Sequence, residues 1–123
     1  MSITKAYRNA RFLTGEDARS VRILCEYLEP LSRLRNEGVH RAIVAFGSAR
    51  LRRQTTLDEG ARDYYSEAAD LGERLARWTI ATHAPDNRYS LVAGGGPGIM
   101  EAFHEGGARV DRKLNLGLGI SLP

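Results

Sequence analysis

Three consecutive glycines stand where an apolar run gives way to a helix-like segment, and this junction restricts the possible folds more than any other feature. The stretch reads LVAGGGPGIMEAFHEGG, residues 91–107. Glycine allows positive φ and lets another segment or a ligand approach the main chain closely. Such a junction is typical of a loop that joins a buried β-strand to the N-terminus of an α-helix.

The chain around this junction alternates between strand-like and helix-like patterns. Apolar, β-branched runs predict strands at residues 41–47, 89–93 and 114–122. Helical periodicity predicts helices at residues 58–81 and 97–108. The alternation predicts an α/β fold, a Rossmann-like parallel sheet with flanking crossover helices. We expect about three strands and hence an incomplete sheet, because parallel sheets are normally covered on both faces.

A polar arm and an amphipathic helix are expected ahead of the sheet. Residues 1–15 are polar and predict a loose arm, and residues 16–38 predict an N-terminal helix that Pro30 kinks or splits. Residues 16–123 would then form the N-terminal part of one Rossmann-like domain, with its sheet region at 41–123. The apolar face of the first helix is Val21, Leu24, Leu28, Leu31 and Leu34. The helix at 58–81 has an apolar stripe that we expect in the core: Tyr64, Ala68, Leu71, Leu75 and Trp78.

Composition argues against several functional classes. No apolar run approaches the ~20 residues of a transmembrane helix, and the N-terminus has no signal-peptide core, so we expect a cytoplasmic protein without a membrane partner. The single cysteine, Cys25, is expected to be a buried, inert thiol. The three histidines lie far apart and have no metal-ligand spacing, so no metal site is expected.

The charge pattern does not favour nucleic acid. The formal net charge is +3, but acidic residues are mixed with the basic ones throughout. The only dense basic cluster is Arg50, Arg52 and Arg53. A solvated loop explains this cluster at least as well as a polynucleotide site does. Arginine also suits phosphate, because its planar guanidinium presents a fork of donors.

Two loops have the composition of a phosphate site. The first helical N–H groups lack intrahelical partners, and Pro97 suits the first helical position. The first predicted strand ends in FGSAR, which supplies a hydroxyl and a guanidinium. Because the C-terminal ends of adjacent parallel strands share one crevice, we expect the two loops to meet. The candidate phosphate- or nucleotide-binding residues are Ser48, Arg50, Gly94, Gly95, Gly96, Gly98, Ile99 and Met100. A turn that needs glycine for geometry alone is the alternative.

Standard nucleotide motifs do not fit this loop. A Walker loop requires Lys-Ser or Lys-Thr after its last glycine, whereas Ile99 and Met100 follow Gly98. The G-x-G-x-x-G fingerprint also fails, since its sixth position falls on Ile99 or Glu101. ATP-hydrolysing and NAD-dependent enzymes are therefore disfavoured.

FGSAR, followed one predicted helix and strand later by GGGPGIMEA and then by GLGISLP, resembles the LOG (Lonely Guy) family. The resemblance covers about residues 41–123. It implies a Rossmann-like fold, a homodimer, and hydrolysis of the N-glycosidic bond of nucleoside 5′-monophosphates, either cytokinin nucleotides or nucleotides such as AMP. The products would be a free base and ribose 5-phosphate, and no metal or redox cofactor is implied. Only the phosphate-side residues above match the family's pattern.

The family's second signature, PGGxGTxxE, is absent from the sequence, and so are its catalytic glutamate and arginine. We therefore expect catalytic residues beyond Pro123 and leave open whether this chain is itself an enzyme. Glu101 matches the family motif, but a carboxylate there also favours a helix N-terminus. The family's older label, possible lysine decarboxylase, is rejected because neither Lys5 nor Lys113 has a setting suited to a Schiff base.

Two other functions stay open. One is a nucleotide- or cofactor-binding module without catalysis, similar to molybdenum-cofactor carriers. The other is a structural fragment whose exposed sheet edge pairs with another chain, since unpaired edges invite association.

Overall fold

The computed structural model describes residues 4–53 and 61–120 and contains two compact units, Met1–Gly38 and Val39–Pro123. The described residues do not include the start of the arm predicted at 1–15, the start of the helix predicted at 58–81 or the end of the strand predicted at 114–122.

The first unit is helical. Its helices are α1 (Ala10–Thr14) and α2 (Arg19–Asn36), with 3₁₀ turns at Ala6–Arg8 and Glu16–Ala18. Arg22 Nη1 donates hydrogen bonds to the carbonyls of Leu13 (2.8 Å) and Gly15 (2.5 Å), which ties the end of α1 to the start of α2. The predicted arm therefore contains a short helix, and α2 continues through Pro30 without a break.

The prediction of a buried thiol is wrong. No residue of α2 is buried, and Cys25 is exposed. The apolar residues expected on one face of α2 are present, but Leu24 is 54% exposed and Val21 43%. The sequence pattern correctly predicts an amphipathic helix, but amphipathicity alone does not say whether the apolar face is covered.

The second unit contains the predicted parallel sheet. Its strands are β1 (Ala42–Ala45), β2 (Ser90–Ala93) and β3 (Asn115–Gly117), in the order β1-β2-β3. Both pairs are parallel, and Val44, Val92 and Leu116 stand in register across the sheet. The α/β fold with a three-stranded parallel sheet, flanking helices and a preceding helix is thus confirmed, with each strand shorter than predicted.

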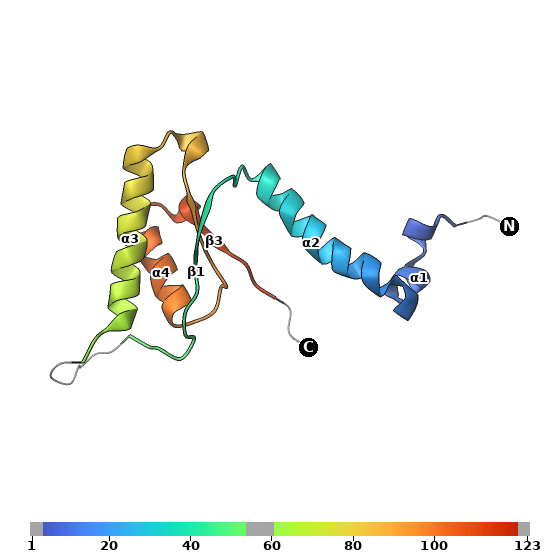
Figure 1. Cartoon of the computed structure of the whole chain (residues 1–123), viewed down its shortest axis with the longest axis horizontal. Coiled ribbons are helices and arrows are strands. Elements are labelled where there is room, and N and C mark those ends of the chain that lie inside the picture. Colours follow the sequence, from blue (N-terminus) through green and yellow to red (C-terminus); the bar gives the residue numbers. More distant parts are fainter. Residues whose placement is uncertain (1–3, 54–60, 121–123) are drawn as a thin grey trace. The chain divides into compact units, whose positions relative to one another are not determined.

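Two helices, α3 (Tyr64–Thr82) and α4 (Ile99–Ala108), lie on the same side of the strands (Figure 1). They pack on the face of the sheet that carries Ile43, Ala45 and Leu91. The core there contains Leu91 from β2 with Ala76 and Phe103 from the helices. On the opposite face of the sheet Val44 is 51% exposed, whereas Val92, beside it in register, is buried. The connection from β1 to β2 through α3 and the connection from β2 to β3 through α4 run in the same direction across the sheet. Because both crossovers have the same hand, both helices lie on one face.

The beginning of α3 is set by a cap. Asp63 accepts hydrogen bonds from the Ser66 N–H (3.1 Å) and the Ser66 hydroxyl (2.5 Å), which satisfies a donor of the first turn. The helix therefore begins at Tyr64, later than the predicted residue 58. It ends at Thr82, and a 3₁₀ turn at Pro85–Asn87 follows, where the sequence predicts a turn.

The predicted core stripe of α3 is right only in part, because the most buried face of the helix lies one position further along the chain. The buried face of α3 consists of Tyr65, Ala69, Gly72, Ala76 and Thr79. These are mostly small residues because α4 approaches very closely: a Cβ added to Gly106 would lie 1.8 Å from the Ala69 carbonyl oxygen. Of the predicted stripe, Ala68 and Leu75 are half-buried and pack against the core. Tyr64, Leu71 and Trp78 are exposed, Leu71 to 52%.

Candidate functional site

The two glycine-containing loops meet at the C-terminal edge of the sheet, as the sequence predicts. The main-chain N–H of Ile99 donates a hydrogen bond of 3.1 Å to the carbonyl of Ser48. Gly98, which precedes α4, is buried and has a φ of 77°, a conformation that favours glycine. A Cβ at Gly98 would lie 2.2 Å from the Ser48 oxygen. The loop after β1 therefore lies directly against the start of α4.

Pro97 is not the first residue of α4, which corrects the prediction. The helix begins at Ile99 with Gly98 as its N-cap. The backbone of Gly98 (φ 77°, ψ −131°) lies outside the helical region, so the helix cannot extend back to Pro97. The close contact with Ser48 explains this conformation.

Several main-chain donors near the start of α4 have no hydrogen-bond acceptor in the part of the chain that the structure describes. Among the described residues, none accepts a main-chain hydrogen bond from the N–H groups of Gly95, Gly96, Met100 or Glu101. The N–H of Ile99 is already used by Ser48. A helix of this length adds roughly half a positive charge at its N-terminus. The arrangement can hold one small anion through main-chain donors.

The predicted side chains lie around this helix start. The Ser48 hydroxyl accepts a hydrogen bond of 3.1 Å from the Arg50 N–H, and the Arg50 side chain is exposed. The side chain of Met100 packs on the glycine loop, since a Cβ at Gly96 would lie 2.8 Å from its Cε and one at Gly94 3.1 Å from its Sδ. Packing against Met100 is therefore a second reason for glycine at Gly94 and Gly96. This contact supports the alternative that the turn needs glycine for its geometry alone.

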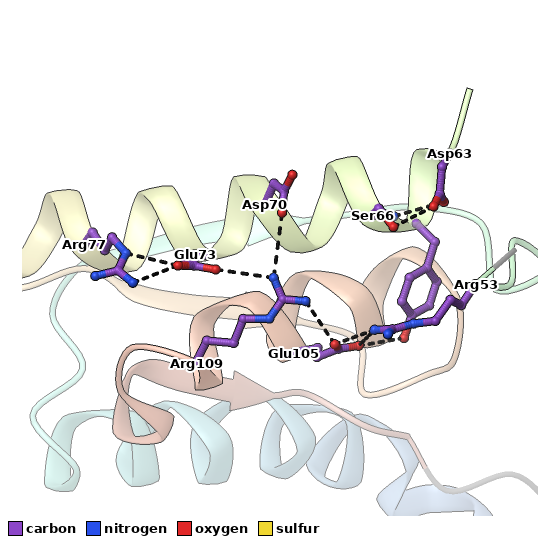
Figure 2. A network of polar contacts seen from close by, with 9 residues as sticks. Arg53, Asp63, Ser66, Asp70, Glu73, Arg77, Glu105 and Arg109 are labelled. Carbon is purple, nitrogen blue, oxygen red and sulfur yellow. Dashed lines mark hydrogen bonds and ion pairs between the residues drawn. The ribbon is translucent and has the colours of Figure 1, made fainter. Parts of the chain in front are cut away.

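A polar network that the sequence did not predict joins the same loop to α4 (Figure 2). Arg53 Nη2 contacts both carboxylate oxygens of Glu105, one of them at 2.6 Å. The Tyr65 hydroxyl donates to Glu105 Oε2 at 3.2 Å, and the Arg53 guanidinium lies 5.3 Å from the centre of the Tyr65 ring. Arg53 thus holds the end of the loop that carries Arg50. In the sequence, the only indication of a role for Arg53 was its place in the cluster Arg50, Arg52 and Arg53.

The network continues along α3 and α4 through Arg109, as Figure 2 shows. Arg109 contacts Glu105 (3.1 Å) and Glu73 (3.3 Å), and Arg77 donates to Glu73 at 2.8 Å. Hydrogen bonds from Arg53 lower the pKa of Glu105, and hydrogen bonds from Arg77 and Arg109 lower the pKa of Glu73. These carboxylates are therefore held charged as parts of the packing of the two helices.

The carboxylates near the proposed anion site have structural roles or lie in solvent. Glu101 is exposed in the first turn of α4, where its charge favours the helix N-terminus. Burial, followed by the charge of Glu101, raises the pKa of Tyr65. Within residues 4–53 and 61–120, no group of three His, Cys, Asp or Glu side chains could hold a metal ion. In the same part of the chain, no helix is both long and apolar enough to cross a membrane.

Comparison with protein-family models gave no match to this chain. A search of curated proteins also found no matching protein.

Proposed function

We propose that this chain binds the phosphate of a nucleoside 5′-monophosphate at the start of α4, as the phosphate-binding part of a LOG-type phosphoribohydrolase. The observation that carries the proposal is the hydrogen bond from Ile99 to the Ser48 carbonyl. It holds the FGSAR loop, with its exposed arginine, beside a helix N-terminus whose first N–H groups have no main-chain acceptor among the residues that the structure describes. The resemblance of FGSAR and GGGPGIMEA to the LOG family supports the nucleotide as ligand.

The binding chemistry follows from the donors. A phosphate monoester carries up to two negative charges and accepts hydrogen bonds at several oxygens. Main-chain donors of the glycine loop and of Met100 favour such an anion, and Arg50 can add a charged, two-pronged donor. Neither group discriminates between bases, so the site would recognise the ribose 5′-phosphate part of the ligand.

Hydrolysis of the N-glycosidic bond also requires a carboxylate near the anomeric carbon, to assist attack by water on an oxocarbenium-like centre. The second candidate function is therefore a nucleotide-binding module without catalysis. This second function is favoured by the carboxylate nearest to the loop in sequence, Glu101. It lies in the first turn of α4, where its charge already has a structural role in favouring the helix N-terminus. Both functions use the same phosphate contacts.

Titration of the chain with AMP, adenosine and inorganic phosphate tests the proposal. Binding would be followed by isothermal titration calorimetry and by amide chemical shifts, and release of adenine by chromatography. We expect AMP and phosphate to shift the amides of residues 94–101, and adenosine to leave them unchanged. Adenine release would support the hydrolase, whereas binding of AMP without release would support the binding module.

The matched variants are Arg50→Gln and Arg52→Gln, which remove one exposed guanidinium each from the same loop. Loss of a charge-assisted contact should weaken AMP binding about tenfold in Arg50→Gln and leave Arg52→Gln close to wild type. Equal affinities in the two variants would remove Arg50 from the site. Absence of any AMP binding, or shifts confined to other residues, would overturn the proposal.

A further inference from the structure

The loop after β1 has no regular secondary structure to hold it in place. We call residues 46–53 the arginine loop; all of them are exposed, and none lies in a helix or a strand. An exposed segment of this kind samples several conformations unless specific contacts restrain it. Its start is held by the hydrogen bond from the Ile99 N–H to the Ser48 carbonyl. The position of Arg50, two residues later, therefore depends on what restrains the other end.

The other end of the arginine loop is held by the side chain of Arg53. Its Nη2 donates to both carboxylate oxygens of Glu105, at 2.6 Å to Oε2 (Figure 2). Its guanidinium also lies 5.3 Å from the centre of the ring of Tyr65, which is only 7% exposed. A carboxylate and a buried aromatic ring together restrict both the position and the orientation of a guanidinium.

Glu105 is a suitable anchor because its carboxylate is itself fixed. It accepts a hydrogen bond from the Tyr65 hydroxyl at 3.2 Å and another from Arg109 Nη2 at 3.1 Å. Isolated surface ion pairs contribute little, partly because two mobile side chains must be ordered. Here one partner is already ordered by the packing of α3 and α4, so Arg53 alone must be immobilised when the pair forms.

The two arginines at this end of the sheet therefore have different surroundings. The charge of Arg53 is paired with Glu105, whereas no carboxylate of the described residues forms an ion pair with Arg50. Arg53 is thus occupied within the protein, and the guanidinium of Arg50 remains available for an anion. Holding a loop in its binding conformation before the ligand arrives increases affinity, because the ordering does not have to occur on binding.

We propose that Glu105 is a positioning residue of the phosphate site, which holds the arginine loop through Arg53 so that Arg50 can contact an anion at the start of α4. The inference rests on the proposed function and adds to it two residues that do not themselves touch the ligand. It predicts that affinity for the phosphate depends on a contact in the middle of α4.

The sign of the effect distinguishes positioning from direct electrostatics. A carboxylate on α4 repels a phosphate bound at the start of that helix, so removing its charge would by itself strengthen binding. Removal would also release Arg53, whose charge could then attract the phosphate directly. If Glu105 positions the loop, its neutralisation should weaken binding instead. The two explanations therefore predict opposite changes in affinity for the same variant.

The test is the affinity of the full chain for AMP, measured by isothermal titration calorimetry well below the melting temperature of each variant. Glu105→Gln and Arg53→Gln should each raise the Kd about three- to fivefold. Arg53→Lys keeps the charge and should recover part of that affinity. Arg109→Gln is the matched control, because it removes another contact of Glu105 and a link between α3 and α4 but leaves the pair with Arg53. It should bind AMP like wild type.

Two further measurements show whether the effect passes through the arginine loop. In an Arg50→Gln background, Glu105→Gln should cause almost no further loss of affinity, because the guanidinium that it positions is absent. Without ligand, ¹⁵N relaxation should show faster motion of the amides of residues 49–52 in Glu105→Gln than in Arg109→Gln.

The possible failures can be told apart. The inference alone is overturned by unchanged or tighter AMP binding in Glu105→Gln, by an equal loss in Arg109→Gln, by a full further loss in the Arg50→Gln background, or by loop motion that Glu105→Gln leaves unchanged. Absence of AMP binding by the wild-type chain would overturn the proposed function and the inference with it.

Discussion

Arg53 and Glu105 are 52 positions apart in the chain, and the guanidinium of one contacts both carboxylate oxygens of the other. Their pair links the loop after β1 to the middle of α4. The same loop is also attached to the first residue of α4, through the hydrogen bond from Ile99 to Ser48. Arg50 lies in sequence between Ser48 and Arg53, the two residues that attach the loop to α4. Both attachments therefore restrict where the backbone of Arg50 lies relative to the proposed phosphate site.

Removing either partner of this pair should weaken the attachment. We expect Arg53→Gln and Glu105→Gln each to lower the melting temperature by about 2–5 °C, the range for a partly exposed ion pair in a small domain. Glu105→Gln should lose more than Arg53→Gln, because it also weakens the contacts of Glu105 with Arg109 and Tyr65. The double variant should lose little more than Glu105→Gln alone, because that variant already lacks the ion pair with Arg53. A double-mutant cycle by thermal denaturation measures this coupling. Additive losses would show that the two side chains act separately.

Stability should fall at acid pH because of the same carboxylates. The pKa values of Glu105 and Glu73 are lowered in the folded chain, chiefly by hydrogen bonds from Arg53 and from Arg77 respectively. A lowered folded pKa means that the unfolded chain binds protons first. The stabilisation is therefore complete above the ordinary value near 4.5 and is lost as the pH falls through the lowered values.

Melting temperatures measured from neutral pH down to about pH 3 test this dependence. The wild-type chain should lose stability steadily below the ordinary glutamate pKa. A variant with Glu105→Gln and Glu73→Gln lacks the two titrating groups and should have a shallower slope over the same range. Parallel slopes for the two proteins would assign the acid sensitivity to other carboxylates, such as Asp63, whose pKa is lowered by its hydrogen bonds with Ser66.

Gly98 should tolerate substitution less well than Gly95, although both have positive φ. Each variant to alanine incurs the left-handed backbone penalty of about 1–2 kcal/mol. At Gly95 a Cβ would meet nothing within 4 Å, whereas at Gly98 it would lie 2.2 Å from the Ser48 oxygen. Overpacking adds about 1–3 kcal/mol, so Gly98→Ala should cost about 2–5 kcal/mol in total. Urea denaturation of the two variants compares them, and equal losses would contradict the close contact.

The sequence predicted the elements and the meeting of the two loops more reliably than it predicted the faces of the helices. Strand runs such as residues 41–47 and the glycine junction are local signals, and the parallel topology makes their C-terminal ends neighbours. The buried face of α3 depends on how closely α4 approaches, which is a property of two segments together. Small residues such as Ala69 and Gly72 have low hydrophobicity but fit that contact, while Leu71 and Trp78 do not.

For the candidate site, the sequence predicted which loops meet but not the side-chain contacts between them. The position of Ser48 beside the start of α4 follows from the fold, and the structure brings them together. The pairing of Arg53 with Glu105 could not be predicted, because Arg53 is one of several exposed arginines in its loop and its partner is 52 positions away, on a helix that the loop meets only in the tertiary structure. The start of α4 at Ile99 rather than Pro97 also depends on a tertiary contact, the approach of Gly98 to Ser48.

Thr79 should be sensitive to the loss of its hydroxyl. It is fully buried, and its Oγ1 accepts a hydrogen bond of 2.8 Å from the main-chain N–H of Tyr89, just before β2. Thr79→Val keeps the shape but leaves that N–H without its acceptor, which should cost about 1–3 kcal/mol. Thr79→Ser keeps the acceptor and should lose less. Chemical denaturation of both variants measures the difference, and a larger loss in Thr79→Ser would show that the methyl group matters more than the hydroxyl.

Gly106 provides a case in which helix propensity and tertiary packing predict opposite signs. It lies inside α4, where replacement of glycine by alanine normally stabilises a helix by about 1 kcal/mol. Here the added Cβ would lie 1.8 Å from the carbonyl oxygen of Ala69, so α3 and α4 would have to separate. Because the core depends on this contact, we expect Gly106→Ala to destabilise the chain by about 2 kcal/mol or more. Gly119→Ala, which places a Cβ in open space, is the control for the general effect of the substitution. A Gly106→Ala variant as stable as wild type in urea would mean that the two helices are not in main-chain contact in solution.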